Sequence, residues 1–155
     1  MREISAGIII YRRATARLDD YSRPAAHEPK FLIVYHGKSY WNFPKGRVES
    51  EEKSWQAAVR EIREETGLRL RDLKFKRQFK AYEKFVFYRQ KEKIFKIVIF
   101  YLAEARKSEV RLSHEHEGYG WFTYKEAMKI LSKFKDSQRV LAQANDFIHQ
   151  DRRHA

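Results

Sequence analysis

One segment, residues 50–66, constrains the fold most, because its apolar residues recur at the spacing of an α-helix. These residues are Trp55, Ala58, Val59 and Ile62, which would form one stripe facing a core. Ser50 is suited to cap the amino end, and two acidic residues follow it in the first turn. Gly67 can adopt the left-handed conformation that ends many helices. The sequence therefore predicts an amphipathic helix here.

Three carboxylates share one side of this predicted helix. Glu61, Glu64 and Glu65 stand at positions i, i+3 and i+4, which places them on one strip beside the apolar stripe. Like charges so close repel each other unless cations neutralise them, and converging carboxylate oxygens are the ligands that Mg²⁺ or Mn²⁺ prefers. The same pattern is also typical of a solvated acidic face paired with Arg60 and Arg63. The spacing alone leaves both interpretations open.

The length and composition limit the class of protein. A chain of 155 residues is long enough for one compact domain with a core, so we expect a single domain over residues 1–155. The chain contains no cysteine, which leaves oxygen atoms and histidines as the metal ligands. No apolar run is long enough to cross a bilayer, and no secretory signal is recognised. We therefore expect a soluble cytoplasmic protein with no membrane partner.

The charge of the chain is strongly positive and unevenly distributed. The formal net charge is +12, from 33 Lys and Arg against 21 Asp and Glu. Such an excess indicates either an anionic partner or a host with lysine-rich proteins. Residues 69–96 contain eleven basic and three acidic residues, whereas the acidic residues gather in residues 46–68.

The remaining elements predict an α/β (α+β) fold. Apolar and β-branched runs predict strands over residues 5–12, 30–36, 73–79, 82–89, 94–104 and 119–122. Helical periodicity predicts two short helices over residues 124–132 and 137–149. Residues 14–29 have the composition of an exposed loop, and residues 41–50 are rich in turn formers. This order of elements favours a mixed sheet with helices on both faces.

A wider pattern surrounds the carboxylates. Its positions are Gly46, Glu52, Arg60, Glu61, Ile62, Glu64, Glu65, Gly67 and Leu68. This pattern resembles the Nudix box, with every fixed position filled. The resemblance implies a Nudix fold, an α/β/α sandwich around a mixed sheet. It also implies metal-dependent hydrolysis of a phosphoanhydride bond in a nucleoside polyphosphate.

The resemblance also implies roles for the box residues. Glu61, Glu64 and Glu65 would coordinate Mg²⁺, with Mn²⁺ as a substitute. Glu52 and Arg60 would orient the loop and the carboxylates. The chemistry requires the metal because a densely negative polyphosphate resists attack by water until cations neutralise its oxygens.

Two further segments resemble the asymmetric bis(5'-nucleosyl)-tetraphosphatases, a branch of this family that splits diadenosine tetraphosphate into ATP and AMP. The first is residues 41–46, WNFPKG, which resembles the entry to the box in that branch. The second is residues 112–121, LSHEHEGYGW. The resemblance covers nearly the whole chain. It departs at residues 14–29, which are long for the branch, and at the basic and aromatic residues 82–93.

Several substrate contacts are implied by position in this branch. Tyr119 would stack on an adenine, Tyr88 is a second candidate for the ring, and Trp41 opens the entry motif. Tyr119 and Tyr88 also suit ordinary packing on a sheet. The polar candidates are Lys45 and Lys96 for phosphates, His36 for the polyphosphate, and Glu115 as a further metal ligand or base.

Two other functions fit the sequence. One is a nucleoside triphosphate pyrophosphohydrolase, or an enzyme that removes pyrophosphate from the 5' end of RNA, because basic residues supply affinity for RNA phosphates. The other is a noncatalytic Nudix domain that binds nucleotides or RNA, although such a domain would usually have lost part of the glutamate cluster. The family resemblance favours a monomer.

Overall fold

A computed structural model describes residues 1–13, 28–112 and 118–153. Its strands and helices follow each other in the order β1 (Arg2–Arg12), β2 (Lys30–Tyr35), β3 (Trp41–Asn42), β4 (Lys45–Arg47), α1 (Ser54–Thr66), the 3-10 helix η3 (Leu70–Asp72), β5 (Leu73–Phe75), β6 (Ala81–Arg89), β7 (Glu92–Ala105), β8 (Gly118–Thr123), α2 (Tyr124–Ile130) and α3 (Lys135–Arg153).

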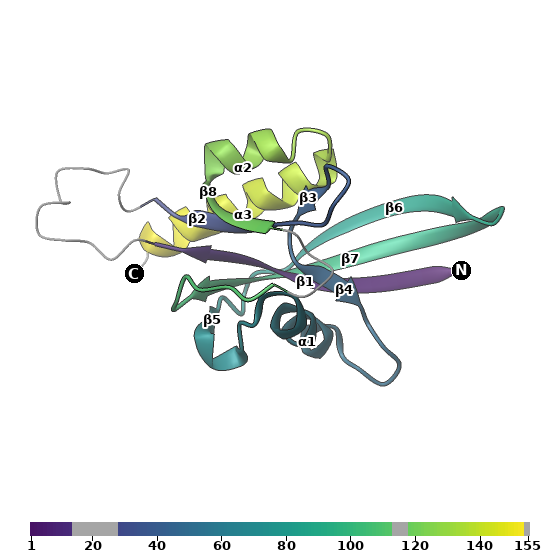
Figure 1. Ribbon diagram of the computed structural model, residues 1–155, viewed down its shortest axis with the longest axis horizontal. Helices are drawn as coiled ribbons and strands as arrows, with labels where there is room; N and C mark the ends of the chain where they lie inside the picture. Colours follow the sequence, from purple (N-terminus) through teal and green to yellow (C-terminus); the bar gives the residue numbers. More distant parts are fainter. Residues whose placement is uncertain (14–27, 113–117, 154–155) are drawn as a thin grey trace, which may run out of the picture.

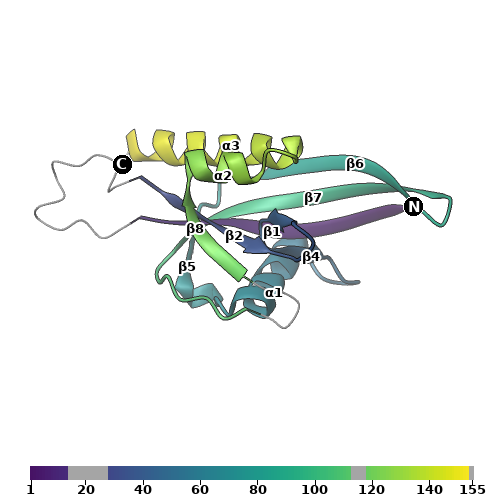
Figure 2. The ribbon, with the colours of Figure 1, turned by 45° about the horizontal axis from the view of Figure 1, so that its top comes forward.

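The eight strands form one mixed sheet. The central path runs β3-β2-β1-β7-β5, while β4 pairs with β1, β6 with β7 and β8 with β2. The long strands β1 and β7 are parallel, and the other pairs are antiparallel. Helix α1 lies on one face of the sheet, and α2 and α3 lie on the other (Figures 1 and 2). The predicted mixed sheet between helical layers is therefore confirmed.

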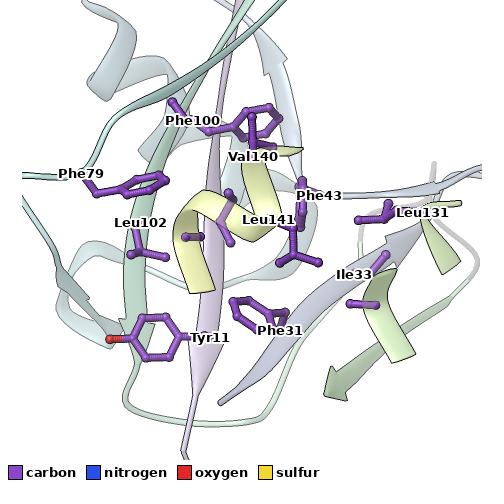
Figure 3. Packing of buried hydrophobic residues seen from close by; sticks show 14 of the residues in the cluster. Tyr11, Phe31, Ile33, Phe43, Phe79, Phe100, Leu102, Leu131, Val140 and Leu141 are labelled. Carbon is purple, nitrogen blue, oxygen red and sulfur yellow. The ribbon is translucent and has the colours of Figure 1, made fainter. Parts of the chain in front are cut away.

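Each face of the sheet has its own apolar core. Alternate residues of β1 separate the two cores, since Ile9 packs under α2 and α3 whereas Ile8 packs under α1. Figure 3 shows the first core, where Phe43 and Phe100 lie beside Val140 and Leu141 of α3.

Within the described residues, no helix has the length and apolar character needed to cross a membrane.

The structure corrects the predicted start of the first helix. Helix α1 begins at Ser54, not at Ser50, because Glu51 adopts a positive φ of 67° that breaks helical geometry. Its end is confirmed, since Gly67 takes a φ of 74° and donates its backbone N–H to Arg63 O. Trp55 does not enter the core as predicted but remains 48% exposed.

Other boundaries also differ from the prediction. The strand predicted over residues 73–79 ends at Phe75, and the turn-rich residues 41–50 contain the short strands β3 and β4. Neither short strand has the length that a periodic pattern needs to be recognised. The predicted loop over residues 14–29 lies almost wholly outside the described residues.

Candidate active site

Two glycines bring strand β4 close to its neighbours. Gly46 pairs with Ala6 of β1 and faces α1, where a Cβ atom would collide with the Glu61 carboxylate. Gly7 pairs with Lys45, and a Cβ there would lie 2.6 Å from Pro44 O. The backbone of β4 is therefore held against the carboxylate side of the helix.

Arg60 connects the loop before α1 to the glutamates on it. Its Nε and Nη2 donate to Glu52 at 2.7 and 3.1 Å, and Nη2 also donates to Arg47 O at 2.9 Å. Its Nη1 donates to Glu61 at 3.0 Å and lies 3.2 Å from Glu64 Oε2. The Arg60 hydrogen bond, together with one from the Glu49 backbone N–H, holds the pKa of Glu52 below its ordinary value. The predicted orienting pair of Glu52 and Arg60 is thus in direct contact.

The three glutamates lie in different surroundings. The Glu61 side chain is 16% exposed, and burial raises its pKa above the ordinary value despite Arg60. Glu65 is buried and accepts a hydrogen bond from the Lys45 backbone N–H at 3.2 Å. The Glu64 side chain is 52% exposed. Among the described residues, no three acidic or histidine side chains converge closely enough to form a ready-made metal site.

A second charged cluster lies on the opposite face of β1. The buried carboxylate of Glu3 accepts hydrogen bonds from Arg89 at 2.7 Å and Arg47 at 2.9 Å, and Lys96 Nζ lies 3.6 Å from it. The Arg89 hydrogen bond and these charges lower the Glu3 pKa. Burial lowers the pKa of Lys96, and the positive charges of Arg47 and Lys45 act in the same direction. Lys96 and Lys45 therefore belong to one basic cluster.

A cavity of about 510 Å³ adjoins Lys45 on this face. It is lined by Tyr40, Asn42, Lys45, Glu83, Phe85, Lys133, Phe134, Lys135, Asp136 and Ser137. Its wall contains a row of polar contacts, in which Asn42 Nδ2 donates to Ser137 Oγ at 3.0 Å and that hydroxyl donates to Glu83 at 2.9 Å. The Tyr40 and Phe134 rings meet edge to face at 5.1 Å. The cavity thus combines aromatic rings with three lysines.

The structure does not bring the predicted aromatic contacts to this cavity. Tyr119 pairs with Val34, whose side chain packs under α1, so Tyr119 lies on the other face of the sheet. Tyr88 is 68% exposed near the end of the β6–β7 hairpin. Trp41 packs against the core, with Tyr35 at 4.9 Å and Phe122 at 6.0 Å. The roles of these three residues stay predictions.

Two polar candidates complete the set. The centre of the His36 ring lies 5.1 Å from that of Tyr40. Tyr40 lines the cavity, and His36 does not. Glu115 lies outside the described residues, so its predicted part in the metal site stays a prediction.

The sequence interpretation missed the cavity-lining rings Tyr40, Phe85 and Phe134. Phe134 stands between two lysines in the short connection from α2 to α3. The available signal was this Lys-Phe-Lys run between two predicted helices, which combines a ring with two cations at a turn. Nothing in its spacing indicated contact with Lys45.

Comparison with known proteins is decisive for the family. Residues 1–144 match the NUDIX domain. This chain belongs to the NUDIX domain family. The Nudix chain is 36% identical over 146 residues to the asymmetrical bis(5'-nucleosyl)-tetraphosphatase of Sus scrofa, covering 93% of this chain and 94% of that protein. It is 32% identical over 130 residues to the enzyme of the same name from Caenorhabditis elegans, covering 81% and 83%.

A solved structure has a similar fold. The crystal structure of a C. elegans Ap4A hydrolase binary complex superposes on the Nudix chain with a TM-score of 0.76 and 26% sequence identity, covering 96% of this chain and 98% of that one. The resemblance recognised in the box thus extends over the sheet and both helical layers.

Proposed function

We propose that this chain, as one domain over residues 1–155, hydrolyses diadenosine tetraphosphate to ATP and AMP. The observation that carries the proposal is the near full-length similarity to proteins named asymmetrical bis(5'-nucleosyl)-tetraphosphatases. The complete glutamate cluster supports hydrolysis rather than binding alone. The basic cluster with Lys45 and Lys96 supports a densely anionic substrate, because neighbouring positive charges attract phosphate groups.

The acidic strip of α1 is the proposed metal site. Glu61, Glu64, Glu65 and Glu115 would hold Mg²⁺, with Mn²⁺ as a substitute. The donor set fits because all four ligands are hard carboxylate oxygens, and because a cation would offset the burial that raises the Glu61 pKa. The bound ion would neutralise phosphate oxygens and lower the pKa of a water molecule.

The protein groups then have separate tasks. A carboxylate of the strip would take the proton of the attacking water. Arg60 would keep Glu61 and the loop residue Glu52 in fixed positions, since it contacts both. Lys45 would link the proposed metal site on α1 to the cavity, because its backbone contacts Glu65 while its side chain lines the cavity.

The cavity next to Lys45 is the proposed nucleoside pocket. Its rings, Tyr40, Phe85 and Phe134, offer faces and edges for a planar base, and base stacking contributes about 1 to 3 kcal/mol. Lys133 and Lys135 at its rim would meet phosphates. This pocket replaces Tyr88, the second candidate, as a proposed site for a base, and it is proposed alongside Tyr119, the first candidate.

The test is product analysis. The protein would be incubated with diadenosine tetraphosphate and Mg²⁺, with and without excess chelator, and the products separated by ion-exchange chromatography. Equal amounts of ATP and AMP, formed only with metal, are the expected result. Two molecules of ADP would contradict asymmetric cleavage. Cleavage of nucleoside triphosphates or 5'-triphosphate RNA alone would move the assignment to those substrates, and binding without turnover would indicate a noncatalytic domain.

A further inference from the structure

Helix α1 covers only part of its face of the sheet. Beyond it, the β6–β7 hairpin and the start of β1 extend past the helical layers (Figure 1). The pairs Tyr82–Ile99, Val86–Phe95 and Tyr88–Lys93 place their side chains on the α1 side. On this face five apolar or aromatic residues are between 37% and 68% exposed, namely Ile4, Tyr82, Val86, Tyr88 and Phe95. We call this set the open hairpin face.

Cations accompany the rings of the open hairpin face. Lys84 Nζ lies 5.9 Å from the centre of the Tyr82 ring, and Lys93 Nζ lies 5.2 Å from that of Phe95. Arg2 is the β1 neighbour of Phe95. No Asp or Glu occupies the positions of β1, β6 and β7 that alternate onto this face. The open hairpin face therefore carries aromatic rings, and all the charged residues at its strand positions are cations.

A cavity of about 630 Å³ continues the face toward α1. Its lining contains the exposed ring of Trp55, the ring of Tyr101, and three cations, Lys76, Arg77 and Lys80. Tyr101 is held by a 2.6 Å hydrogen bond between its hydroxyl and Ser54 Oγ, and Lys80 Nζ lies 5.6 Å from its ring centre. A ring paired with a cation thus occurs three times in a line, at Tyr101, Tyr82 and Phe95. We call this line of three rings and their lysines the track.

We infer that this track binds single-stranded nucleic acid with little sequence preference. Bases stack on aromatic side chains whatever their identity, and lysines beside the rings meet the backbone phosphates. Strand β6 from Ala81 to Tyr88 spans about 24 Å, at about 3.4 Å per residue, which is room for several nucleotides. No carboxylate occupies the strand positions of the track, so these positions would not repel a polyanion. This binding goes beyond the proposed hydrolysis, because the track uses none of the box glutamates.

The first test measures charge contacts by fluorescence anisotropy. The probe is a labelled oligo(U) of about 12 nucleotides, titrated between roughly 50 and 200 mM salt. Lys84→Gln/Lys93→Gln should weaken binding at least about five-fold and reduce the salt slope by roughly 1.4, because two phosphate contacts are lost. The matched control, Lys125→Gln/Lys129→Gln, removes equal charge from exposed positions of α2 on the other face. Equal weakening in both variants would overturn the inference, because net charge alone would then explain binding.

The second test measures stacking. Tyr82→Ala should weaken binding at least about five-fold, whereas Tyr82→Phe, which keeps the ring, should bind like the parent protein. An oligo(dT) of equal length should bind within about three-fold of the RNA, because stacking does not read the sugar. A blunt duplex that binds as tightly, or wild-type binding by Tyr82→Ala, would contradict a stacking track. A dimer in light scattering that Phe95→Ser converts to a monomer would instead assign the face to self-association.

Discussion

Glu64 differs from the other two glutamates of the strip in its exposure. Its side chain is 52% exposed, and its carboxylate contacts Arg60 on the preceding turn. Glu64→Gln removes the charge but keeps the shape, so we expect an unchanged thermal unfolding midpoint. Turnover should fall about 100-fold or more, because a metal ligand or proton acceptor is lost. Steady-state kinetics measures this, with Glu51→Gln as a matched loop control, and near-normal turnover would remove Glu64 from the metal site.

Gly46 of β4 lies directly against the carboxylate of Glu61 on α1. A methyl group there would occupy the space of the Glu61 carboxylate, so Gly46→Ala should displace that ligand. We expect turnover to fall about 100-fold, as for a misplacement of about 1 Å. In Gly118→Ala the new Cβ would meet its nearest neighbour, Tyr35 Cβ, at 3.9 Å, so this control should keep its activity. Retained activity in Gly46→Ala would show that Glu61 can move without consequence.

At the scale of elements, the end of α1 was predictable and its start was not. Gly67 carries its own local signal, because a left-handed residue stops a helix without help from the rest of the chain. The start depends on Glu52, whose carboxylate binds the Glu49 backbone N–H and Arg60 rather than joining the first turn. That competition involves a residue two turns away, which no capping pattern contains. These contacts of Glu52, together with the positive φ of Glu51, keep the residues before Ser54 in a loop.

Glu3 joins four strands through its contacts with Arg47, Arg89 and Lys96. Its pKa lies below the ordinary value of 4.5, so the folded state binds a proton more weakly than the unfolded state. The stabilisation is therefore complete above pH 4.5 and is lost as the pH falls through the lowered pKa. Glu3→Gln should unfold at lower urea concentration than the parent at pH 7, and the gap should close toward pH 3.

Urea titrations monitored by circular dichroism at several pH values measure this difference between the two proteins. Glu109→Gln, an exposed position, is the control and should show a small gap at every pH. A Glu3→Gln gap that stays constant from pH 7 to pH 3 would indicate lost packing rather than lost charge.

At the scale of the whole molecule, the proposed nucleoside pocket joins parts of the chain that are far apart in sequence. Lys45 comes from β4, Phe85 from β6 and Phe134 from the turn between α2 and α3. The box could be recognised because its residues are close in sequence and its chemistry is carried by one helix. The pocket could not, because strand pairing and helix docking determine which rings face Lys45. The sequence therefore predicted the acidic half of the site better than the base-binding half.

Phe134 and Tyr119 are two candidates for stacking on a base, and they lie on opposite faces of the sheet. Phe134 lines the cavity beside Lys45, whereas Tyr119 lies on the opposite face of the sheet. If the cavity holds a base, Phe134→Ala should raise KM for diadenosine tetraphosphate about five-fold or more, because a stacking contact is lost. Phe134→Tyr should keep the parental KM because it keeps the ring.

The same kinetic measurement on Tyr119→Ala decides between the two faces. A raised KM in Tyr119→Ala with an unchanged KM in Phe134→Ala would return the base to the α1 face and remove the cavity from substrate binding. Raised KM values in both variants would mean that the two bases of the dinucleotide occupy opposite faces of the sheet. The polyphosphate would then cross the edge at β4, where the Lys45 backbone meets Glu65. In that case the KM of the double variant, Tyr119→Ala/Phe134→Ala, should rise by the product of the two single increases. The two rings lie on opposite faces of the sheet, so their effects should be independent.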